Sequence, residues 1–390
     1  MRSSLLLALL PAALCSPTQP SKPAPLLQRR DQTSVLPNKY IVKFKDTSVL
    51  TRAESILSTL AVTPEHMFEH VFKGFSGELD QETLEALRNH PDVEYIEEDS
   101  VAGIDAYVDQ ESPTWGLRRI SHKVRGSVPT YRYDDSAGDG TCAYVIDTGI
   151  DVTHPDFEGR ATFAANFADT SDTDGHGHGT HVAGTIGSKT YGVAKKTLLY
   201  GVKVIDDDGK GTTSSMIKGL DFVVADAPKR NCPKGVVANM SLRDNVSVAL
   251  NAAAAALTTN DIFLAVSAGN QSQDASTQSP ASEPTVCTIV ASGITDQLSY
   301  YSNFGAVVDV FAPGDGIDSL APGGKTVAMS GTSMASPHAA GLAAYFAALE
   351  GWPGASALCE LLKSYAQNDA VKNIPAGTVN KLIYNGNPDA

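Results

Sequence analysis

Three residues far apart in the sequence have the side chains that nucleophilic catalysis requires. Asp147 follows an apolar run, His178 lies in a glycine-rich loop, and Ser333 stands at the start of a long apolar helix. A serine hydroxyl is a weak nucleophile until a neighbouring base takes its proton. A histidine near the positive end of a helix dipole stays neutral and can act as that base. The backbone N–H of Ser333, at the start of its helix, is free to stabilise an oxyanion.

Each of these residues also has a commoner structural role. An aspartate after a strand is often a helix cap, and a serine at a helix start usually caps that helix. His176, His178 and His181 could chelate zinc, but no acidic or further histidine ligand recurs at a fitting spacing, so metal catalysis is disfavoured. The catalytic interpretation therefore depends on the three residues meeting in the folded chain.

An α/β domain would bring them together. The predicted strands are continuously apolar, and they span 142–146, 198–205, 236–242, 262–267, 286–291 and 307–311. Segments between them, such as 213–226 and 247–258, have helical length. Continuous apolar strands are typical of a parallel sheet that is buried on both faces, so we predict a doubly wound, mostly parallel α/β domain over 108–390. Ligands bind beyond the carboxyl ends of such strands, and Asp147 and Asn270 are expected on that rim.

A smaller domain is expected before this one. Residues 16–37 are rich in proline, serine, glutamine and basic side chains, and we predict a flexible spacer there. Between about 38 and 100 the pattern runs strand, helix, two strands, helix, strand, which indicates a small α+β ferredoxin-like domain. Residues 1–15 combine a basic start, a short apolar run and small residues, as in a signal peptide. Residues 16–107 would then form one N-terminal segment.

The composition limits the partners and the compartment. The net charge of −14 argues against nucleic acid or an anionic membrane as a partner, because both would repel the chain. No later stretch reaches the roughly 20 apolar residues of a membrane span, so a soluble, exported protein is expected. Of the five cysteines, four remain once Cys15 leaves with the signal peptide. This even number suggests two disulfides, for which the sequence alone permits three pairings.

Three motifs in chain order carry a resemblance to a known family. Residues 147–149 read Asp-Thr-Gly, residues 178–181 read His-Gly-Thr-His, and residues 331–335 read Gly-Thr-Ser-Met-Ala. They resemble the signature motifs of subtilisin-like serine proteases, in which the order is aspartate, histidine, serine. The resemblance runs from about Trp115 to the end of the chain.

Other segments narrow the resemblance. Residues 191–197, 231–237 and 279–284 are similar to the branch of the family that contains proteinase K and its fungal relatives. Residues 38–105 resemble the inhibitory propeptide of the family, notably at residues 72–75, which read Phe-Lys-Gly-Phe. The resemblance therefore covers both expected domains.

The resemblance implies a secreted serine endopeptidase that is made as a zymogen and needs no catalytic cofactor. Ser333 would attack the peptide carbonyl, with His178 as base and then as acid toward the leaving amine. Asp147 would orient His178 and stabilise its charged form. The Asn270 side chain and the Ser333 backbone N–H would hold the oxyanion. The implied partners are protein or peptide substrates and the chain's own propeptide, and a monomer is expected.

The resemblance also implies where a substrate would bind. An extended peptide would add a strand between segments 209–214 and 241–245, and segment 267–269 would form the floor of the first side-chain pocket. The implied substrate-binding residues are Gly209, Gly211, Thr213, Ser241, Leu242, Arg243, Ser267, Ala268 and Gly269.

Stabilising features are implied as well. The resemblance pairs the cysteines as Cys142–Cys232 and Cys287–Cys359. It places structural calcium at the carbonyls of Pro284 and Val286 and the carboxylate of Asp309, which suits oxygen ligation of a hard cation. The alternative for Asp309 is an ordinary carboxylate at a strand end.

One segment departs from the family pattern. Where relatives have a run of glycines after Ser-Leu, this chain reads Arg243-Asp244-Asn245. Glycine there would let the substrate backbone approach closely. Arg243 could narrow specificity, favouring acidic or small side chains, or it could obstruct binding and leave a weak enzyme or an inactive peptide-binding pseudoprotease. The first is preferred because all four catalytic positions are intact. Asn245 also begins a glycosylation sequon in a predicted loop.

Two other kinds of protein share part of the pattern. An aspartic protease also uses Asp-Thr-Gly, but it needs two carboxylates that share a proton, and no second motif of this kind occurs. A non-catalytic peptide-binding protein would show neither labelling of Ser333 nor self-processing. Self-processing is the sharper expectation: the tail 100–107 should lie in the cleft like a product and be cut near Ala106 or Tyr107. The N-terminal domain would then stay bound as an inhibitor.

Overall fold

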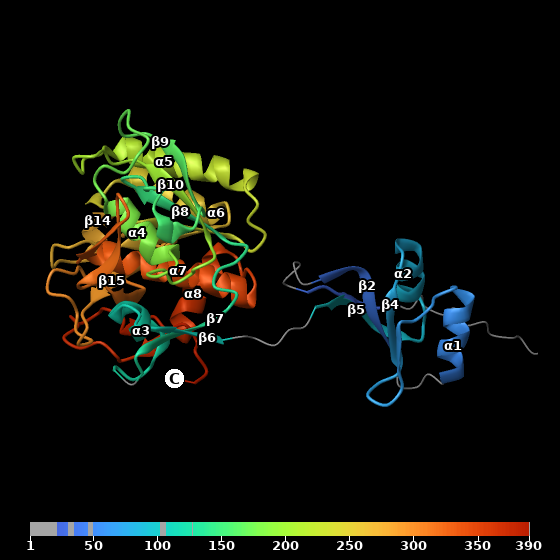
Figure 1. Ribbon diagram of the computed structural model, residues 1–390. Helices are drawn as coiled ribbons and strands as arrows, with labels where there is room; N and C mark the ends of the chain where they lie inside the picture. Colours follow the sequence, from blue (N-terminus) through green and yellow to red (C-terminus); the bar gives the residue numbers. More distant parts are fainter. Residues whose placement is uncertain (1–21, 30–34, 46–49, 102–106, 127, 390) are drawn as a thin grey trace, which may run out of the picture. The chain divides into compact units, whose positions relative to one another are not determined.

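The computed structural model describes residues 22–29, 35–45, 50–101, 107–126 and 128–389. The chain divides into two compact units, Met1–Ala102 and Gly103–Ala390 (Figure 1). The predicted signal peptide and Ala106 lie outside the described residues. Within those residues, none of the helices combines the length and hydrophobicity that crossing a membrane requires.

The N-terminal unit has the predicted ferredoxin-like order of elements. Its sheet has the strand order β1-β5-β2-β4-β3. The elements are β1 (Leu26–Leu27), β2 (Val35–Phe44), α1 (Leu50–Thr59), β3 (His66–Phe68), β4 (Gly74–Glu78), α2 (Gln81–Arg88) and β5 (Val93–Ser100). Strand β2 is antiparallel to both β4 and β5, and β3 is antiparallel to β4. Phe44, Phe75, Leu87 and Ile96 are buried between this sheet and the helices.

The prediction of a flexible spacer over 16–37 is wrong for part of that segment. Leu26 and Leu27 form β1, which pairs in parallel with Ile96 and Glu97 of β5. The backbone N–H of Ala24 donates to the carbonyl of Arg88 at 2.6 Å, and the Ala24 side chain is buried. Proline and serine content says nothing about pairing with a strand that lies far along the sequence, which is why the composition misled.

The second unit is built on the predicted, mostly parallel sheet. Its nine strands have the order β19-β20-β16-β15-β13-β11-β8-β10-β9. They are β8 (Cys142–Asp147), β9 (Ala161–Asn166), β10 (Leu198–Lys203), β11 (Val236–Met240), β13 (Ile262–Ser267), β15 (Cys287–Ser292), β16 (Val310–Pro313), β19 (Gln367–Asn368) and β20 (Lys381–Leu382). Only the pairing of β19 with β20 is antiparallel. Each of the six predicted strands overlaps one of these, and β9 was missed because its residues are only partly apolar.

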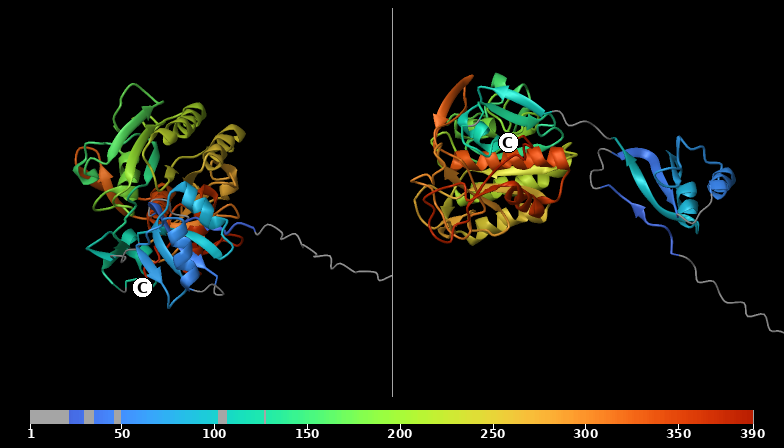
Figure 2. Two further views of the ribbon diagram at one scale, coloured as in Figure 1. Left: turned by 90° about the vertical axis from the view of Figure 1, so that its right-hand side faces the viewer. Right: turned by 90° about the horizontal axis from the view of Figure 1, so that it is seen from below.

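Helices cover both faces of this sheet (Figures 1 and 2). They are α3 (Trp115–Ser121), α4 (His178–Gly187), α5 (Thr213–Asp226), α6 (Val248–Thr259), α7 (Thr332–Glu350) and α8 (Ala355–Tyr365). Along β8, Ala143 and Val145 pack into a core shared with α4 and α7, whereas Tyr144 and Ile146 pack into a core shared with α5 and α6. This alternation along one strand defines a doubly wound sheet and confirms the predicted fold class.

Short elements complete the unit. The paired strands are β6 (Tyr107–Glu111) with β7 (Thr130–Asp134), β12 (Asp244–Asn245) with β14 (Gln278–Ser279), and β17 (Ile317–Ala321) with β18 (Lys325–Met329). Single 3₁₀ turns occur at Pro155–Phe157, Ala227–Lys229 and Ala275–Thr277.

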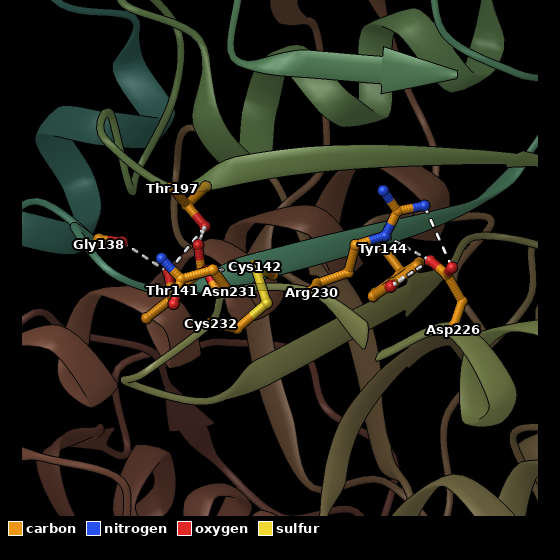
Figure 3. Close-up of a disulfide and its surroundings, with 9 residues drawn as sticks. All are labelled: Gly138, Thr141, Cys142, Tyr144, Thr197, Asp226, Arg230, Asn231 and Cys232. Carbon is orange, nitrogen blue, oxygen red and sulfur yellow. Dashed lines mark hydrogen bonds and ion pairs between the residues drawn. A yellow bond between two sulfur atoms is a disulfide. The ribbon is translucent and has the colours of Figure 1, made fainter. Parts of the chain in front are cut away.

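Two disulfides tie a loop and a helix to the sheet. Cys142, the first residue of β8, is bonded to Cys232 in the loop before β11 (Figure 3). Cys287, the first residue of β15, is bonded to Cys359 in α8. These are the two pairings that the resemblance implied.

Candidate active site

Asp147 and His178 meet at the carboxyl end of β8. Asp147 is the last residue of that strand, and His178 is the first residue of α4. The His178 Nδ1–H donates to the Asp147 Oδ1 at 2.7 Å, and the backbone N–H of Thr148 donates to the same oxygen at 2.8 Å. The Asp147 side chain is fully buried, whereas that of His178 is about one-fifth exposed. The carboxylate therefore holds the imidazole ring, and the opposite edge of the ring remains accessible.

Ser333 lies in the same cleft as His178. It is the second residue of α7, and its hydroxyl donates to the carbonyl of Ser241 at 3.2 Å. The Ser241 hydroxyl donates in turn to the carbonyl of Ser333 at 2.8 Å. His178, Ser333 and Asn270 all line a cleft of about 440 Å³. Catalytic hydrogen bonds often tighten only when substrate binds. A Ser333 hydroxyl that is bonded to the Ser241 carbonyl therefore suits an enzyme without bound substrate.

The loop before His178 is held by Asp174, which sequence reasoning did not single out. Its Oδ1 accepts hydrogen bonds from the Thr148 hydroxyl at 2.8 Å and from the Gly177 N–H at 2.7 Å. Its Oδ2 accepts from the backbone N–H and the hydroxyl of Thr180. The carboxylate is buried, so it fixes the start of α4 against the strand that carries Asp147. The position of Asp174 at the start of the glycine-rich loop was the sequence signal that could have identified it.

Glycine is required directly after His178. A Cβ on Gly179 would lie 2.1 Å from the carbonyl oxygen of Gly149 and 3.2 Å from the Cβ of Asp147. Real side chains do not approach a backbone oxygen so closely. Gly179 therefore allows α4 to begin close enough to β8 for the hydrogen bond between His178 and Asp147.

The charge of Asp147 acts on the protonation of His178. Burial opposes the imidazolium form, but the nearby Asp147 carboxylate outweighs this and raises the pKa of His178 above its ordinary value. Burial lowers the pKa of His181 to about 4, and its Nε2–H donates to the carbonyl of Ile317 at 2.9 Å. In the part of the chain that the structure describes, no group of possible metal ligands includes His176, His178 or His181. The zinc interpretation gains no support.

Asn270 is oriented by the start of α7. Its Oδ1 accepts hydrogen bonds from the backbone N–H of Thr332 at 2.9 Å and from the Thr332 hydroxyl at 2.8 Å. The amide oxygen is thereby occupied, which leaves the Nδ2 group for the cleft that Asn270 lines. The backbone N–H of Ser333 lies at the same helix start. Two donors thus stand beside the candidate nucleophile.

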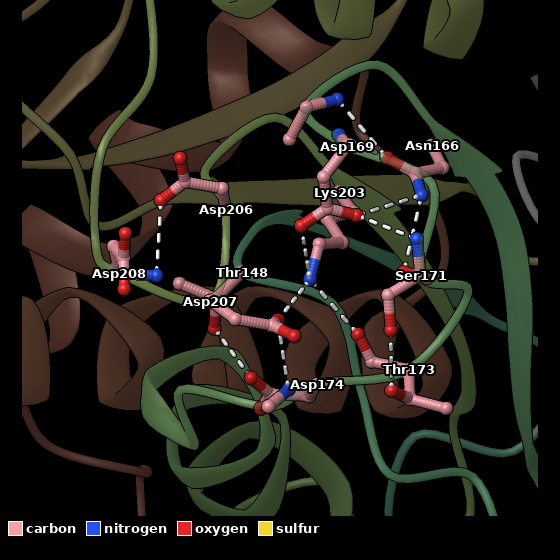
Figure 4. A network of polar contacts seen from close by, with 12 residues as sticks. Thr148, Asn166, Asp169, Ser171, Thr173, Asp174, Lys203, Asp206, Asp207 and Asp208 are labelled. Atoms are coloured by element: carbon pink, nitrogen blue, oxygen red, sulfur yellow. Dashed lines mark hydrogen bonds and ion pairs between the residues drawn. The ribbon is translucent and has the colours of Figure 1, made fainter.

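A buried lysine connects the loops around the cleft (Figure 4). Lys203 is the last residue of β10, and its ammonium lies 3.2 Å from the Asp169 Oδ2 and 3.0 Å from the Thr173 carbonyl oxygen. It also pairs with the carboxylate of Asp207, whose Oδ1 accepts the backbone N–H of Gly175 at 3.0 Å. Lys203 therefore links the loop before His178 to the loop that forms one wall of the cleft.

Most of the predicted substrate-binding residues line the cleft. Those that do are Gly209, Gly211, Ser241, Leu242, Arg243, Ser267 and Gly269. Ala268 is buried behind the surface, and Thr213 bonds to Asp244 instead of lining the cleft. Six further lining residues were not predicted as site residues, namely Thr148, His176, Ile205, Lys210, Met216 and Thr332. Lys210 lies inside the predicted segment 209–214, the others lie near predicted segments or catalytic residues, and nothing in their residue types alone marks them.

The Asp309 carboxylate, one of the predicted calcium ligands, already has other partners. The Asp309 Oδ2 accepts the backbone N–H of Thr288 at 2.8 Å, and its Oδ1 lies 2.6 Å from the ammonium of Lys363. A calcium ion takes six to eight oxygen ligands, and here both carboxylate oxygens already have partners. The calcium site stays a prediction. Asn245 is exposed in β12, so its sequon is accessible and glycosylation also stays a prediction.

The fold and the cleft have the arrangement of an α/β serine hydrolase, with a carboxylate, an imidazole and a hydroxyl on one rim of a doubly wound sheet. The model of the subtilase family matches residues 138–381, and that of peptidase inhibitor I9 matches residues 39–104. The chain belongs to the subtilase family and is a subtilisin-type serine endopeptidase preceded by an inhibitor-type propeptide.

Two named relatives are similar to this chain over nearly its whole length. It is 53% identical over 389 residues to the subtilisin-like serine protease AsES of Sarocladium strictum, with all of both chains covered. It is 51% identical to the cuticle-degrading protease of Metarhizium anisopliae, covering 99% of this chain and 100% of the relative. The crystal structure of a cold-adapted subtilisin-like serine proteinase matches with a TM-score of 0.67 and 39% identity, covering 70% of this chain and 99% of that one.

Proposed function

We propose that the chain is a secreted endopeptidase whose catalytic triad is Asp147, His178 and Ser333. The observation that carries this proposal is the 2.7 Å hydrogen bond from His178 to the buried Asp147, in a cleft that Ser333 and Asn270 also line. Subtilase membership supplies the reaction class, which is peptide-bond hydrolysis.

In the proposed reaction the Ser333 Oγ bonds to the peptide carbonyl carbon while its proton passes to the Nε2 of His178. The carbonyl oxygen becomes an oxyanion, which the Asn270 Nδ2 and the Ser333 N–H stabilise. Collapse breaks the C–N bond, and the Nε2 proton goes to the leaving amine. Water then attacks the acyl carbon while His178 Nε2 takes its proton, and collapse breaks the bond to the Ser333 Oγ, which regains its proton from Nε2 as the acid leaves.

The N-terminal unit fits a zymogen, because residues 39–104 match peptidase inhibitor I9. We propose that a signal peptide directs export, that the chain cuts itself near Ala106 or Tyr107, and that the released unit then inhibits the enzyme. Tyr107 is the first residue of β6, which pairs with β7, so a cut there would leave the new terminus next to an ordered strand. A monomeric, exported enzyme with two disulfides completes the proposal.

The test uses the full chain expressed with Ser333→Ala. The variant should stay at full length after removal of the signal peptide, whereas the unchanged protein and the exposed α8 variant Ser364→Ala should mature. A serine-directed fluorophosphonate should label only the two proteins that keep Ser333. If Ser333→Ala matures in the absence of other proteases, self-cleavage is wrong. If the unchanged protein is neither labelled nor processed, the peptide-binding pseudoprotease becomes the better account.

A further inference from the structure

Two cationic side chains line the cleft from opposite walls. Lys210 belongs to the wall that contains segment 209–214, and Arg243 belongs to the wall that contains segment 241–245. Both residues are exposed. Across the described ranges, no ion pair or side-chain hydrogen bond engages the Arg243 guanidinium or the Lys210 ammonium. Both charges are therefore available to a peptide that lies between the walls.

The carboxylates of Asp244 and Asp206, which lie close to Arg243 and Lys210 in the sequence, have other partners. Asp244 follows Arg243, but its Oδ2 accepts the Thr213 hydroxyl at 2.5 Å, a bond that joins the two walls. The Asp206 Oδ1 accepts the backbone N–H groups of Asp208 and Lys210.

Asp207 pairs with Lys203, and Asp208 is exposed on the same loop. Among the described residues that line the cleft there is no aspartate or glutamate. The cleft is thus locally cationic in a chain whose net charge is −14.

We propose that the cleft selects peptides with acidic side chains at the positions between these two walls. The inference rests on the proposed function, because it concerns the substrate of the same site. A guanidinium binds a carboxylate through two parallel hydrogen bonds, and an ammonium adds a point charge from the other side. Exposed charge pairs are screened by salt, so the selectivity is strongest at low ionic strength.

The experiment compares three peptides that differ only at these positions, which carry glutamate, glutamine or lysine. The processed enzyme should have a kcat/KM for the glutamate peptide roughly tenfold above that for the glutamine peptide and further above that for the lysine peptide. Arg243→Gly and Lys210→Ser should each reduce the preference, and the double variant should remove it. Lys229→Ser, at an exposed lysine of the 3₁₀ turn Ala227–Lys229 that does not line the cleft, should leave the preference unchanged.

The outcomes separate the two proposals. Cleavage of the glutamine peptide at a normal rate with no preference for glutamate overturns this inference alone. A preference that survives in the double variant also overturns it, because other groups would then select the substrate. Failure to cleave any of the three peptides overturns the proposed function and this inference together.

A second inference comes from Asp309, which does not line the cleft. The Lys363 ammonium lies 2.6 Å from the Asp309 Oδ1 and 2.8 Å from the Glu360 Oε1. Both Lys363 and Asp309 side chains are about four-fifths buried. A fixed positive charge in contact with the carboxylate would repel a divalent cation at the same oxygen.

We infer that the Lys363 ammonium takes the position that calcium would need, so the chain supplies its own cation there. Lys363 lies in α8, whereas Asp309 directly precedes β16, so the ion pair fastens the helix to the sheet as a bound ion would. The carbonyls of Pro284 and Val286 are then not needed as ligands.

The test measures the thermal midpoint of the processed enzyme in calcium and in a chelator. Lys363→Ala should gain a calcium-dependent rise of several degrees that the unchanged enzyme lacks, and adding Asp309→Asn should abolish that gain. Lys372→Ala, an exposed lysine without this contact, should behave like the unchanged enzyme. An equal calcium response with and without Lys363→Ala overturns the inference, as does a gain that persists when Asp309 is changed.

Discussion

At the residue scale, the hydrogen bond from His178 to Asp147 controls both the tautomer and the charge of the base. His178 must be neutral to accept the Ser333 proton, so activity should fall as the pH drops through the pKa of His178. Asp147 raises that pKa above its ordinary value of 6.5, which places the acid limb of the pH profile above 6.5.

Asp147→Asn should therefore change the rate and the pH profile together. An amide favours the wrong ring tautomer, so kcat should fall by about 10⁴-fold. Loss of the carboxylate also lowers the pKa of His178, so the remaining activity should extend to lower pH. The measurement is kcat/KM against pH, with Asp318→Asn, an exposed residue of β17, as the control. An acid limb at the same pH would contradict this account.

Asn270 acts on the transition state rather than on the bound substrate. Asn270→Ala should lower kcat by roughly 10²–10³-fold with little change in KM, because a tetrahedral oxyanion forms only during reaction. Steady-state kinetics on one peptide decide this. A variant that mainly raises KM would show that Asn270 binds substrate instead of the oxyanion.

At the element scale, catalysis depends on how closely α4 and α7 pack, since these helices carry His178 and Ser333. Gly341 of α7 lies against the end of α4. A Cβ there would be 2.9 Å from the carbonyl oxygen of Ile186 and 2.8 Å from the Cβ of Val193. The contact leaves no room for a methyl group.

Gly341→Ala should push the two helices apart. We expect a loss of about 1–3 kcal/mol in the free energy of unfolding, as overpacked cores show, together with a lower kcat. Urea unfolding and steady-state kinetics would measure the two effects. Unchanged stability would mean that the helices can separate at no cost.

At the scale of the whole molecule, the disulfides restrain the unfolded chain more than they shape the cleft. Cys287 and Cys359 are 72 residues apart in the sequence, and a bridge of this kind contributes about 2–4 kcal/mol. Changing both to serine should lower the free energy of unfolding by that amount while leaving kcat/KM at 25 °C nearly unchanged. A large loss of activity in the folded variant would show that this bridge also positions the cleft.

The fold could be predicted to a large extent because its signals are local. Continuous apolar runs marked six strands of the parallel sheet, and the helix predicted at 213–226 has the same bounds as α5. The order of Asp147, His178 and Ser333, with glycine beside each motif, indicated the candidate site. The prediction of a flexible spacer over 16–37 failed because β1 is defined by its pairing with β5, and composition carries no information about that pairing.

By itself the sequence determined which segments form the sheet and which three side chains could form the catalytic group, since periodicity and motif order are written along the chain. Only the tertiary structure decided the contacts between distant polar groups: Thr213 with Asp244 between the segments 209–214 and 241–245, Lys203 with Asp207 beside the loop before His178, and Lys363 with Asp309 at the sheet. Such pairs have no local pattern, because a charge finds its partner through the packing of whole elements.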